Sequence, residues 1–227
     1  MAGLFLLGTI HLDIKSAPSL LAALHDLRPD IVTVEISKYS VEFRRKQYPV
    51  WKNSLRMALK SVPIKQRAHP QIRLLKRQIT MPYEWSVAKE YCDTSSIPCI
   101  PVDSSLLAKK ELPAWKQDLL APENVKFLVK GPWFSLESYF LKHHKTALDL
   151  WERPHPPGIK TTLSFLKRPF WRQREKTLAV RLKRFMGLGC RLVHIGGWMH
   201  FLDSIEHATL YSQLADLVCE KRLILRN

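Results

Sequence analysis

The sequence predicts an α/β fold, with a mostly parallel central sheet and flanking helices. Three observations support this fold class. Short apolar runs at residues 4–9, 31–34 and 192–195 are separated by segments with helical spacing. These runs show little polar alternation, which is typical of strands buried on both faces. The first two runs and the helix between them form a βαβ unit, whose crossover should be right-handed.

The first half of the chain supplies three of the expected strands. A strand at 4–9 is followed by a helix that starts near Ser16, a plausible N-cap, with Pro18 in its first turn. A second strand is expected over residues 30–36, with its apolar run at 31–34 ending in Glu35. The aromatic and basic stretch from 39 to 91 is punctuated by prolines, so we expect several short helices there. A third strand at 97–102 contains two prolines and ends at Asp103.

The second half is expected to be mainly helical before the chain returns to the sheet. Residues 106–151 have helical character in pieces, and 161–186 form a basic helical region interrupted at Pro169. A fourth strand follows at 191–195, then an amphipathic helix at 205–219 and a short strand at 222–225. We therefore expect one domain over residues 1–227, with a basic helical insertion at about 40–95 and further helices at about 104–186.

The charge of the chain is strongly positive and unevenly distributed. The 227 residues carry a formal net charge of +16. Residues 43–83 contain 11 Lys and Arg and no acidic residue, and residues 153–191 contain 11 against the single Glu175. Such segments attract anions, which include an acidic substrate, phospholipid head groups and nucleic acid. The sequence contains no recognisable RNA- or DNA-binding motif, and basic segments are often only solvated surface.

Other features favour a cytoplasmic protein. No apolar run approaches the roughly 18 residues of a membrane span, and the apolar start lacks the basic region of a signal peptide. The four cysteines form no Cys-x-x-Cys pair, so we expect reduced thiols. No feature of the sequence sets an oligomeric state.

Two short motifs at opposite ends of the chain indicate a functional site. Gly-x-x-His occurs at Gly8/His11 and again at Gly197/His200, each time closing an apolar strand. Glycine lets the backbone bend or lets another group approach closely. Because ligands bind at the carboxyl ends of strands in open α/β sheets, we expect both histidines at one edge, together with Glu35.

These groups suit two kinds of chemistry. His11, His200 and Glu35 could form an open metal site, or could act without metal as general base, carboxylate orienter and second proton carrier. The alternatives are ordinary structural roles. Either histidine could be a hydrogen-bonded turn residue, and Glu35 could pair with an arginine. Asp103 could cap a helix, and His194, within a strand, is expected to be a core histidine.

Four stretches together resemble a known family. They are Leu-Leu-Gly-Thr-Ile-His at 6–11, Val-Glu at 34–35, Arg-Glu-x-x-Leu-Ala at 174–179 and Val-His-Ile-Gly-Gly-Trp-Met-His at 193–200. This order is similar to that of the TraB/Tiki superfamily, which is related to ChaN-like and erythromycin-esterase-like proteins. Its hallmark is two Gly-x-x-His motifs with an intervening glutamate and arginine, here matched by Glu35 and Arg174. The resemblance covers both ends of the chain, whereas residues 40–150 do not match in detail.

The resemblance implies an α/β fold with a site made from the two histidines and the glutamate. Tiki proteins are regarded as metal-dependent peptidases, TraB proteins are linked to peptide-pheromone shutdown, ChaN-like proteins bind haem or iron, and the esterase branch hydrolyses without metal. One departure concerns anion binding. Asp103-Ser104 stands where the family pattern has Asp-Arg, which leaves that role to Arg174 or a nearby lysine.

Two functional hypotheses follow. The first is a hydrolase of a peptide or other anionic small substrate with an amide or ester bond. A divalent transition metal (Mn, Co or Zn) would be held by His11, Glu35 and His200. The catalytic residues would be Glu35, Arg174, His11 and His200, and the substrate-binding residues Arg174, Trp198 and Asp103. The second hypothesis is a non-catalytic protein that binds metal or haem, or whose basic surface binds nucleic acid or an anionic membrane.

Overall fold

The computed structural model describes residues 2–153, 159–204 and 208–226. The chain forms two compact units, each made from separate segments. Unit 1 comprises Met1–Ile36, Tyr83–Ser104 and Lys142–Asn227, and unit 2 comprises Ser37–Pro82 and Ser105–Leu141. Unit 1 holds both Gly-x-x-His motifs, whereas unit 2 holds most of the basic stretch that follows Glu35.

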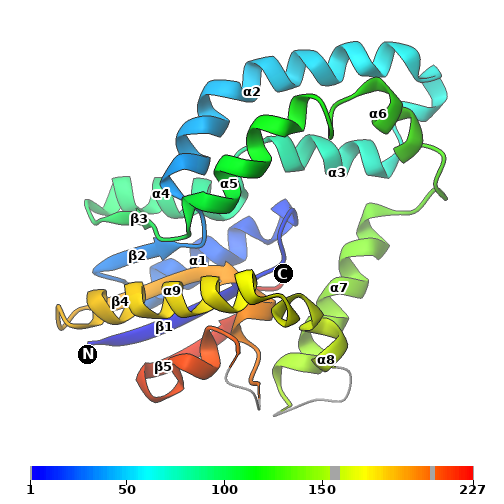
Figure 1. Ribbon diagram of the computed structural model, residues 1–227. Helices are drawn as coiled ribbons and strands as arrows, with labels where there is room; N and C mark the ends of the chain where they lie inside the picture. The colour runs from blue at the N-terminus through cyan, green and yellow to red at the C-terminus, as the bar shows by residue number, and fades with distance from the viewer. Residues whose placement is uncertain (1, 154–158, 205–207, 227) are drawn as a thin grey trace. The chain divides into compact units, whose positions relative to one another are not determined.

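Unit 1 is built on a sheet in which every pairing of the described strands is parallel. The strands are β1 (Gly3–Thr9), β2 (Ile31–Val34), β3 (Cys99–Pro101), β4 (Arg191–Gly197) and β5 (Val218–Leu223). Their order is β3-β2-β4-β1-β5 (Figure 1). The predicted α/β fold with a central parallel sheet is therefore confirmed.

The register of the central strands brings distant motifs together. β1 pairs with β4 so that Gly8 lies opposite Gly196, and β2 pairs with β4 so that Val34 lies opposite Ile195. The backbone N–H of Glu35 extends this pairing by donating to the carbonyl of Ile195 at 2.8 Å. Both Gly-x-x-His motifs and Glu35 thus reach the same edge of the sheet.

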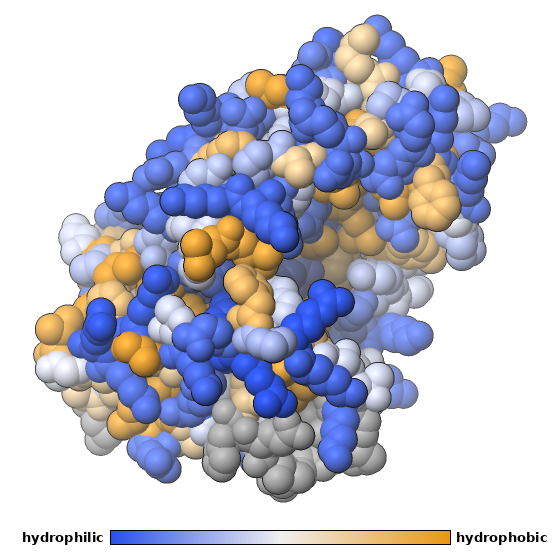
Figure 2. All heavy atoms as spheres, viewed as in Figure 1, coloured by the Kyte–Doolittle hydropathy of each residue, from blue (hydrophilic) through white to orange (hydrophobic). Residues whose placement is uncertain are grey.

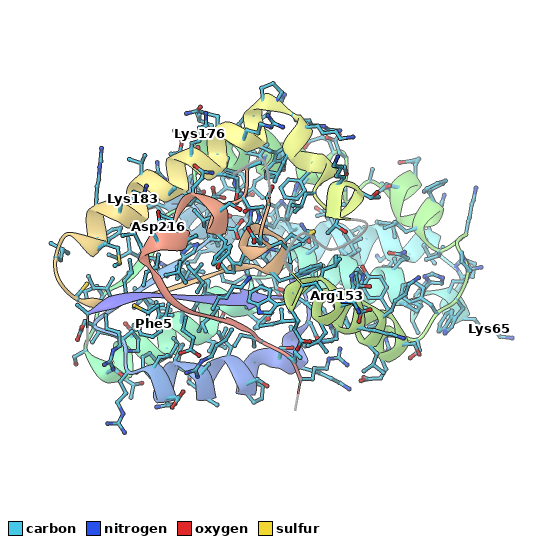
Figure 3. The ribbon with its side chains drawn as sticks, turned by 90° about the horizontal axis from the view of Figure 1, so that it is seen from below. Phe5, Lys65, Arg153, Lys176, Lys183 and Asp216 are labelled. Atoms are coloured by element: carbon cyan, nitrogen blue, oxygen red, sulfur yellow. The ribbon has the colours of Figure 1, made fainter. Side chains whose placement is uncertain are left out.

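Helices cover both faces of this sheet. α1 (Ala17–Leu27) packs against α4 (Tyr83–Ser95), which also contacts β2. α9 (Pro169–Met186) contacts β4 and lies on the opposite face from α1 (Figure 3). The core on the α9 side contains Leu4 and Leu6 of β1, Leu192 of β4, and Leu178 and Leu182 of α9, all at most 1% exposed. The remaining described helices of this unit are the short α8 (Ile159–Thr162) and the 3-10 turns η1 (Ile14–Ser16), η5 (Ser164–Lys167), η6 (Trp198–Phe201), η7 (Tyr211–Gln213) and η8 (Ala215–Leu217).

Unit 2 is helical over its described length and has its own core. Its helices are α2 (Lys38–Ala58), α3 (Pro70–Ile79), α5 (Ser105–Glu111) and α6 (Pro122–Leu128), with 3-10 turns η2 (Leu59–Ser61), η3 (Ile64–Gln66) and η4 (Leu112–Lys116). The core gathers Trp51 and Leu55 of α2, Ile72 and Leu75 of α3, and Val125 of α6. α7 (Leu136–Trp151) begins in unit 2 and continues into unit 1.

Several predicted elements need correction. The expected series of short helices after residue 39 is wrong at its start, because α2 runs unbroken through Pro49. Trp51 and Leu55 anchor the helix beyond the proline, so tertiary packing outweighs the local cost of the proline. The helical insertion does not extend to residue 95 as expected, because α4 belongs to unit 1, and unit 2 takes residues 105–141 instead.

The amphipathic helix predicted for 205–219 is also wrong. Residues 205–207 lie outside the described residues, and the segment that follows forms η7, η8 and then β5. β5 pairs with β1 and so satisfies the hydrogen bonds of an apolar strand that would otherwise form the edge of the sheet.

The surface in the view of Figure 2 is largely hydrophilic, with apolar patches between long polar side chains. Within the described parts of the chain, no helix combines the length and apolar character needed to cross a bilayer.

Candidate functional site

The carboxyl edge of the sheet in unit 1 collects the histidines and carboxylates singled out in the sequence. His11 follows β1 by two residues, Glu35 directly follows β2, and Asp103 follows β3 by two residues. His200 lies in η6, directly after β4. Arg174 reaches the same edge from α9, where it is buried.

The glycines of the motifs are needed because other groups approach them closely. Gly196 and Gly197 are the last residues of β4, so the chain does not turn at them. A Cβ atom on Gly197 would lie 2.7 Å from Nε2 of His11 and 3.3 Å from Cδ2 of His200. A Cβ atom on Gly196 would lie 2.6 Å from Oε2 of Glu35. Of the two roles that the sequence left open for these glycines, close approach is therefore the one they fill.

Glu35 is the centre of a buried ion network. Its Oε1 accepts a hydrogen bond from Nη2 of Arg174 at 2.6 Å, and its Oε2 accepts one from the backbone N–H of Gly197 at 2.7 Å. Nε2 of His200 lies 3.1 Å from Oε1. Burial alone would raise the pKa of Glu35, but His200 and Arg174 outweigh it and hold the pKa well below its usual range. Glu35 is therefore a buried carboxylate anion.

Arg174 joins Glu35 to Asp103. Its Nε and Nη2 donate to the two carboxylate oxygens of Asp103, each at 2.8 Å, in addition to the bond to Glu35. The side chain is only 8% exposed, and its guanidinium lies 5.0 Å from the ring centre of Trp171. Burial alone would lower the pKa of Arg174, but the charges of Glu35 and Asp103 outweigh burial and raise the pKa above its usual value. The side chain therefore stays cationic. The predicted role of Arg174 as an anion clamp would require it to leave these partners.

His200 is held between two carboxylates. Its Nδ1 lies 2.7 Å from Oε1 of Glu175, and its Nε2 faces Glu35. Burial would lower the pKa of His200, but Glu35 and Glu175 raise it to about 10. His200 is therefore an imidazolium at neutral pH. Sequence reasoning did not assign Glu175 to the site, although it is the one acidic residue in the basic segment 153–191 and is fully buried.

His11 differs from the other site residues because solvent reaches it. Its side chain is 53% exposed, and its Nδ1 hydrogen-bonds to Oε1 of Glu84 at 2.8 Å. Glu84, in the first turn of α4, has a side chain only 4% exposed and also accepts a hydrogen bond from the Thr9 hydroxyl at 3.2 Å. Partial desolvation of the ring would lower the pKa of His11, but the hydrogen bond and the charge of Glu84 outweigh it and raise the pKa above its usual value. No sequence spacing linked Glu84 to His11, so sequence reasoning missed this pair.

Trp198 and His194, which the sequence also singles out, are buried. Trp198, expected to bind substrate, is 7% exposed, and its Cα packs beside Gly8. His194, expected to be a core histidine, lies within β4 with Nδ1 3.0 Å from the hydroxyl of Thr33. Burial lowers the pKa of His194 to about 4, so its ring is neutral.

The predicted metal ligands do not fit a metal ion in this arrangement. Across the described ranges, no group of three or more His, Cys, Asp and Glu side chains is placed to hold one. The physical reason is that the donors already bind each other. Both oxygens of Glu35 accept hydrogen bonds from Arg174 or Gly197, and Nε2 of His200 faces Glu35. The metal site stays a prediction, and no step below depends on it.

Comparison of the chain with protein-family models, with curated proteins and with solved structures finds no match. Its function is therefore inferred from the geometry of the site.

Proposed function

We propose that this chain is a hydrolase of ester or amide bonds in which His11 is the general base and Glu84 orients it. One observation carries the proposal: a half-exposed imidazole is hydrogen-bonded through Nδ1 to a buried carboxylate. In such a dyad the carboxylate fixes the ring tautomer and stabilises the imidazolium that forms during reaction. The other charged groups of the site are buried and paired, so His11 is the group best placed to meet a substrate.

The geometry supports a sequence of proton transfers. With Nδ1–H donated to Glu84, Nε2 of His11 carries the free lone pair and accepts a proton from a water molecule that attacks the substrate carbonyl. The imidazolium then returns this proton to the leaving group. Nε2 packs close to Gly197, where a Cβ atom would lie 2.7 Å from it, so the position of the base depends on a glycine at 197.

The buried ion network has a supporting role in this proposal. Arg174 and His200 fix Glu35, and Glu35 accepts the N–H of Gly197. The network therefore holds the end of β4, against which His11 lies. Arg174, Glu35 and His200 would act by positioning the backbone and by their electrostatic field rather than by contacting substrate.

Two further observations support the proposal. The order of the motifs resembles the TraB/Tiki superfamily, whose esterase-like relatives hydrolyse without metal. The net charge of +16 favours a peptide or other small substrate with negative charge. A cytoplasmic setting is part of the proposal, because the four cysteines are free thiols.

A metal-dependent hydrolase is the second candidate, and one observation favours it. Each histidine has a buried carboxylate at Nδ1, Glu84 for His11 and Glu175 for His200. Histidines that bind metal through Nε2 commonly have such a partner. Glu35 would have to exchange its present contacts for the ion, which would supply a bound water of lowered pKa.

The test is hydrolysis of a panel of p-nitrophenyl esters and aminoacyl p-nitroanilides by chelator-treated protein. His11→Ala should lower the rate by roughly 10²- to 10⁴-fold, the usual contribution of general-base catalysis. His25→Ala, which removes an exposed imidazole from α1, is the matched control and should keep the wild-type rate.

The pH profile tests the dyad itself. The base must be neutral, so the rate should rise with pH through the pKa of His11. Because Glu84 raises that pKa, Glu84→Gln should move the acidic limb of the profile to lower pH. An unmoved limb, or full activity in His11→Ala, would contradict the proposal. Activity that returns only after Mn²⁺, Co²⁺ or Zn²⁺ is added would instead support the metal-dependent candidate.

A further inference from the structure

Most of the positive charge of this protein lies in unit 2. Its two segments, Ser37–Pro82 and Ser105–Leu141, contain 17 Lys and Arg and 5 Asp and Glu, a formal charge of +12 out of the total of +16. The proposed hydrolytic site lies in unit 1, which carries only the remaining +4, so attraction of an anionic substrate to His11 does not by itself require the charge of unit 2. The positive charge of unit 2 therefore needs a separate explanation.

Two neighbouring segments of unit 2 carry positive charge that no acidic residue offsets. They are residues 56–70 and 126–133, which we name the apolar-basic tip. They contain no acidic residue and six cations: Arg56, Lys60, Lys65, Arg67, Lys126 and Lys130. The segments lie side by side because η2 packs against α6. They meet again where Nε2 of His69 bonds to the carbonyl of Gly131 at 3.3 Å and the His69 ring lies 5.1 Å from that of Trp133.

Large apolar side chains of the same segments are exposed to solvent. The exposed fraction is 79% for Ile64, 69% for Phe127, 61% for Trp133 and 50% for Met57. Figure 3 shows Lys65, the neighbour of Ile64, pointing outward from the chain. Single exposed apolar residues are common, but several on adjoining segments mark an interaction surface.

Local structure explains why these side chains face outward. Val62 and Val129 from these segments, and Val125 directly before the second segment, are buried in the core of unit 2. Within α6, the burial of Val125 turns Lys126 and Phe127 to the outer face of the helix. The tip is thus a folded surface with its own buried anchors, and its outer layer alternates cations with apolar groups.

We propose that the apolar-basic tip docks onto an anionic phospholipid surface. Lysine and arginine at the tip would contact lipid phosphates, and the apolar side chains would enter the boundary between head groups and acyl chains. A phospholipid surface would engage both the cations and the apolar side chains of the tip. Nucleic acid would use the cations and could stack on Phe127 or Trp133, but it would leave Ile64 and Met57 in water.

The test is sedimentation of the full chain with phosphatidylcholine vesicles that contain either no or 30% phosphatidylserine, a composition chosen to be about a third anionic. Lys65→Ala/Lys130→Ala should weaken binding to anionic vesicles by roughly 25-fold, about fivefold for each cation. Ile64→Ser/Phe127→Ser should weaken it by about tenfold or more, because apolar insertion is lost. All four positions are exposed, so the fold should survive, which circular dichroism can check.

The matched control is Lys176→Ala/Lys183→Ala on α9 of unit 1. It removes the same charge from an exposed face outside the tip (Figure 3), and vesicle binding should fall by less than about twofold. An equal loss in this control would mean that net charge alone drives association, and would overturn the proposal. It would also be overturned if anionic vesicles are not bound, or if Ile64→Ser/Phe127→Ser binds them normally. The same holds if a single-stranded oligonucleotide is bound more tightly than the vesicles.

Discussion

The imidazolium of His200 should make the stability of this protein depend on pH in the alkaline range. Its two ring nitrogens lie 3.1 Å from Glu35 and 2.7 Å from Glu175, and its side chain is 8% exposed. The perturbation is His200→Gln, which keeps a polar side chain of similar length but cannot carry a positive charge. The variant therefore removes the titrating group and leaves both carboxylates in place.

The magnitude follows from the shift in pKa between the unfolded and folded chain. The pKa of His200 rises from 6.5 to about 10. Each unit corresponds to about 1.4 kcal/mol, so this rise of about 3.5 units in pKa contributes on the order of 5 kcal/mol to the free energy of unfolding. Because the folded pKa is the higher one, this contribution is complete below pH 6.5 and is lost as pH rises toward 10.

The assay is urea unfolding of wild type and His200→Gln at several pH values between 6 and 10.5. Other groups that titrate in this range are common to both proteins, so they cancel in the difference between the two free energies. That difference should shrink by about 4–5 kcal/mol over the range. A difference that stays constant within about 1 kcal/mol would refute the assignment of His200 as a buried imidazolium.

Three further substitutions test other parts of the same unit. Arg174→Met should cost about 3–5 kcal/mol in urea unfolding, because it leaves two carboxylates without their cation, whereas Lys176→Met on the exposed face of α9 should stay within about 0.5 kcal/mol. Gly197→Ala should lower the rate of hydrolysis by about a hundredfold, since its Cβ would displace the exposed His11 ring, and should cost much less in stability. If the variant hydrolyses at the wild-type rate, the position of the His11 ring is unimportant. Asp13→Asn should destabilise by about 3 kcal/mol or more, measured by urea unfolding, because fully buried Asp13 holds Arg226 through two bonds of 2.6 and 2.7 Å.

The strands and motifs could be predicted from the sequence because their signals are local. The apolar runs of β1, β2 and β4 are contiguous, and each Gly-x-x-His motif follows its strand within a few residues. Parallel pairing then places the following side chains at one edge, which is why His11, Glu35 and His200 could be grouped without knowledge of the strand order.

The supporting carboxylates could not be predicted because their partners are distant in sequence. Glu84 lies 73 residues from His11, and only the packing of α4 beside the sheet brings them together. Glu175 is adjacent to Arg174, yet its burial depends on where α9 meets the turn that carries His200. Likewise, the first two residues of β5, Val218 and Cys219, were predicted as the end of a helix, since nothing local in their sequence shows that β1 lies free to pair with them.

The central position of β1 and β4 has a consequence for how the protein is made. β1 ends at Thr9, whereas its partner β4 begins only at Arg191, so about 180 residues are synthesised between the two strands. At a synthesis rate of about 5–20 residues per second, the apolar β1 strand waits roughly 10–40 s for that partner. The strands made in that interval, β2 and β3, do not pair with β1 in the folded protein. During that interval the nascent chain carries an apolar strand without its native partners, which is the kind of exposed strand edge that favours aggregation.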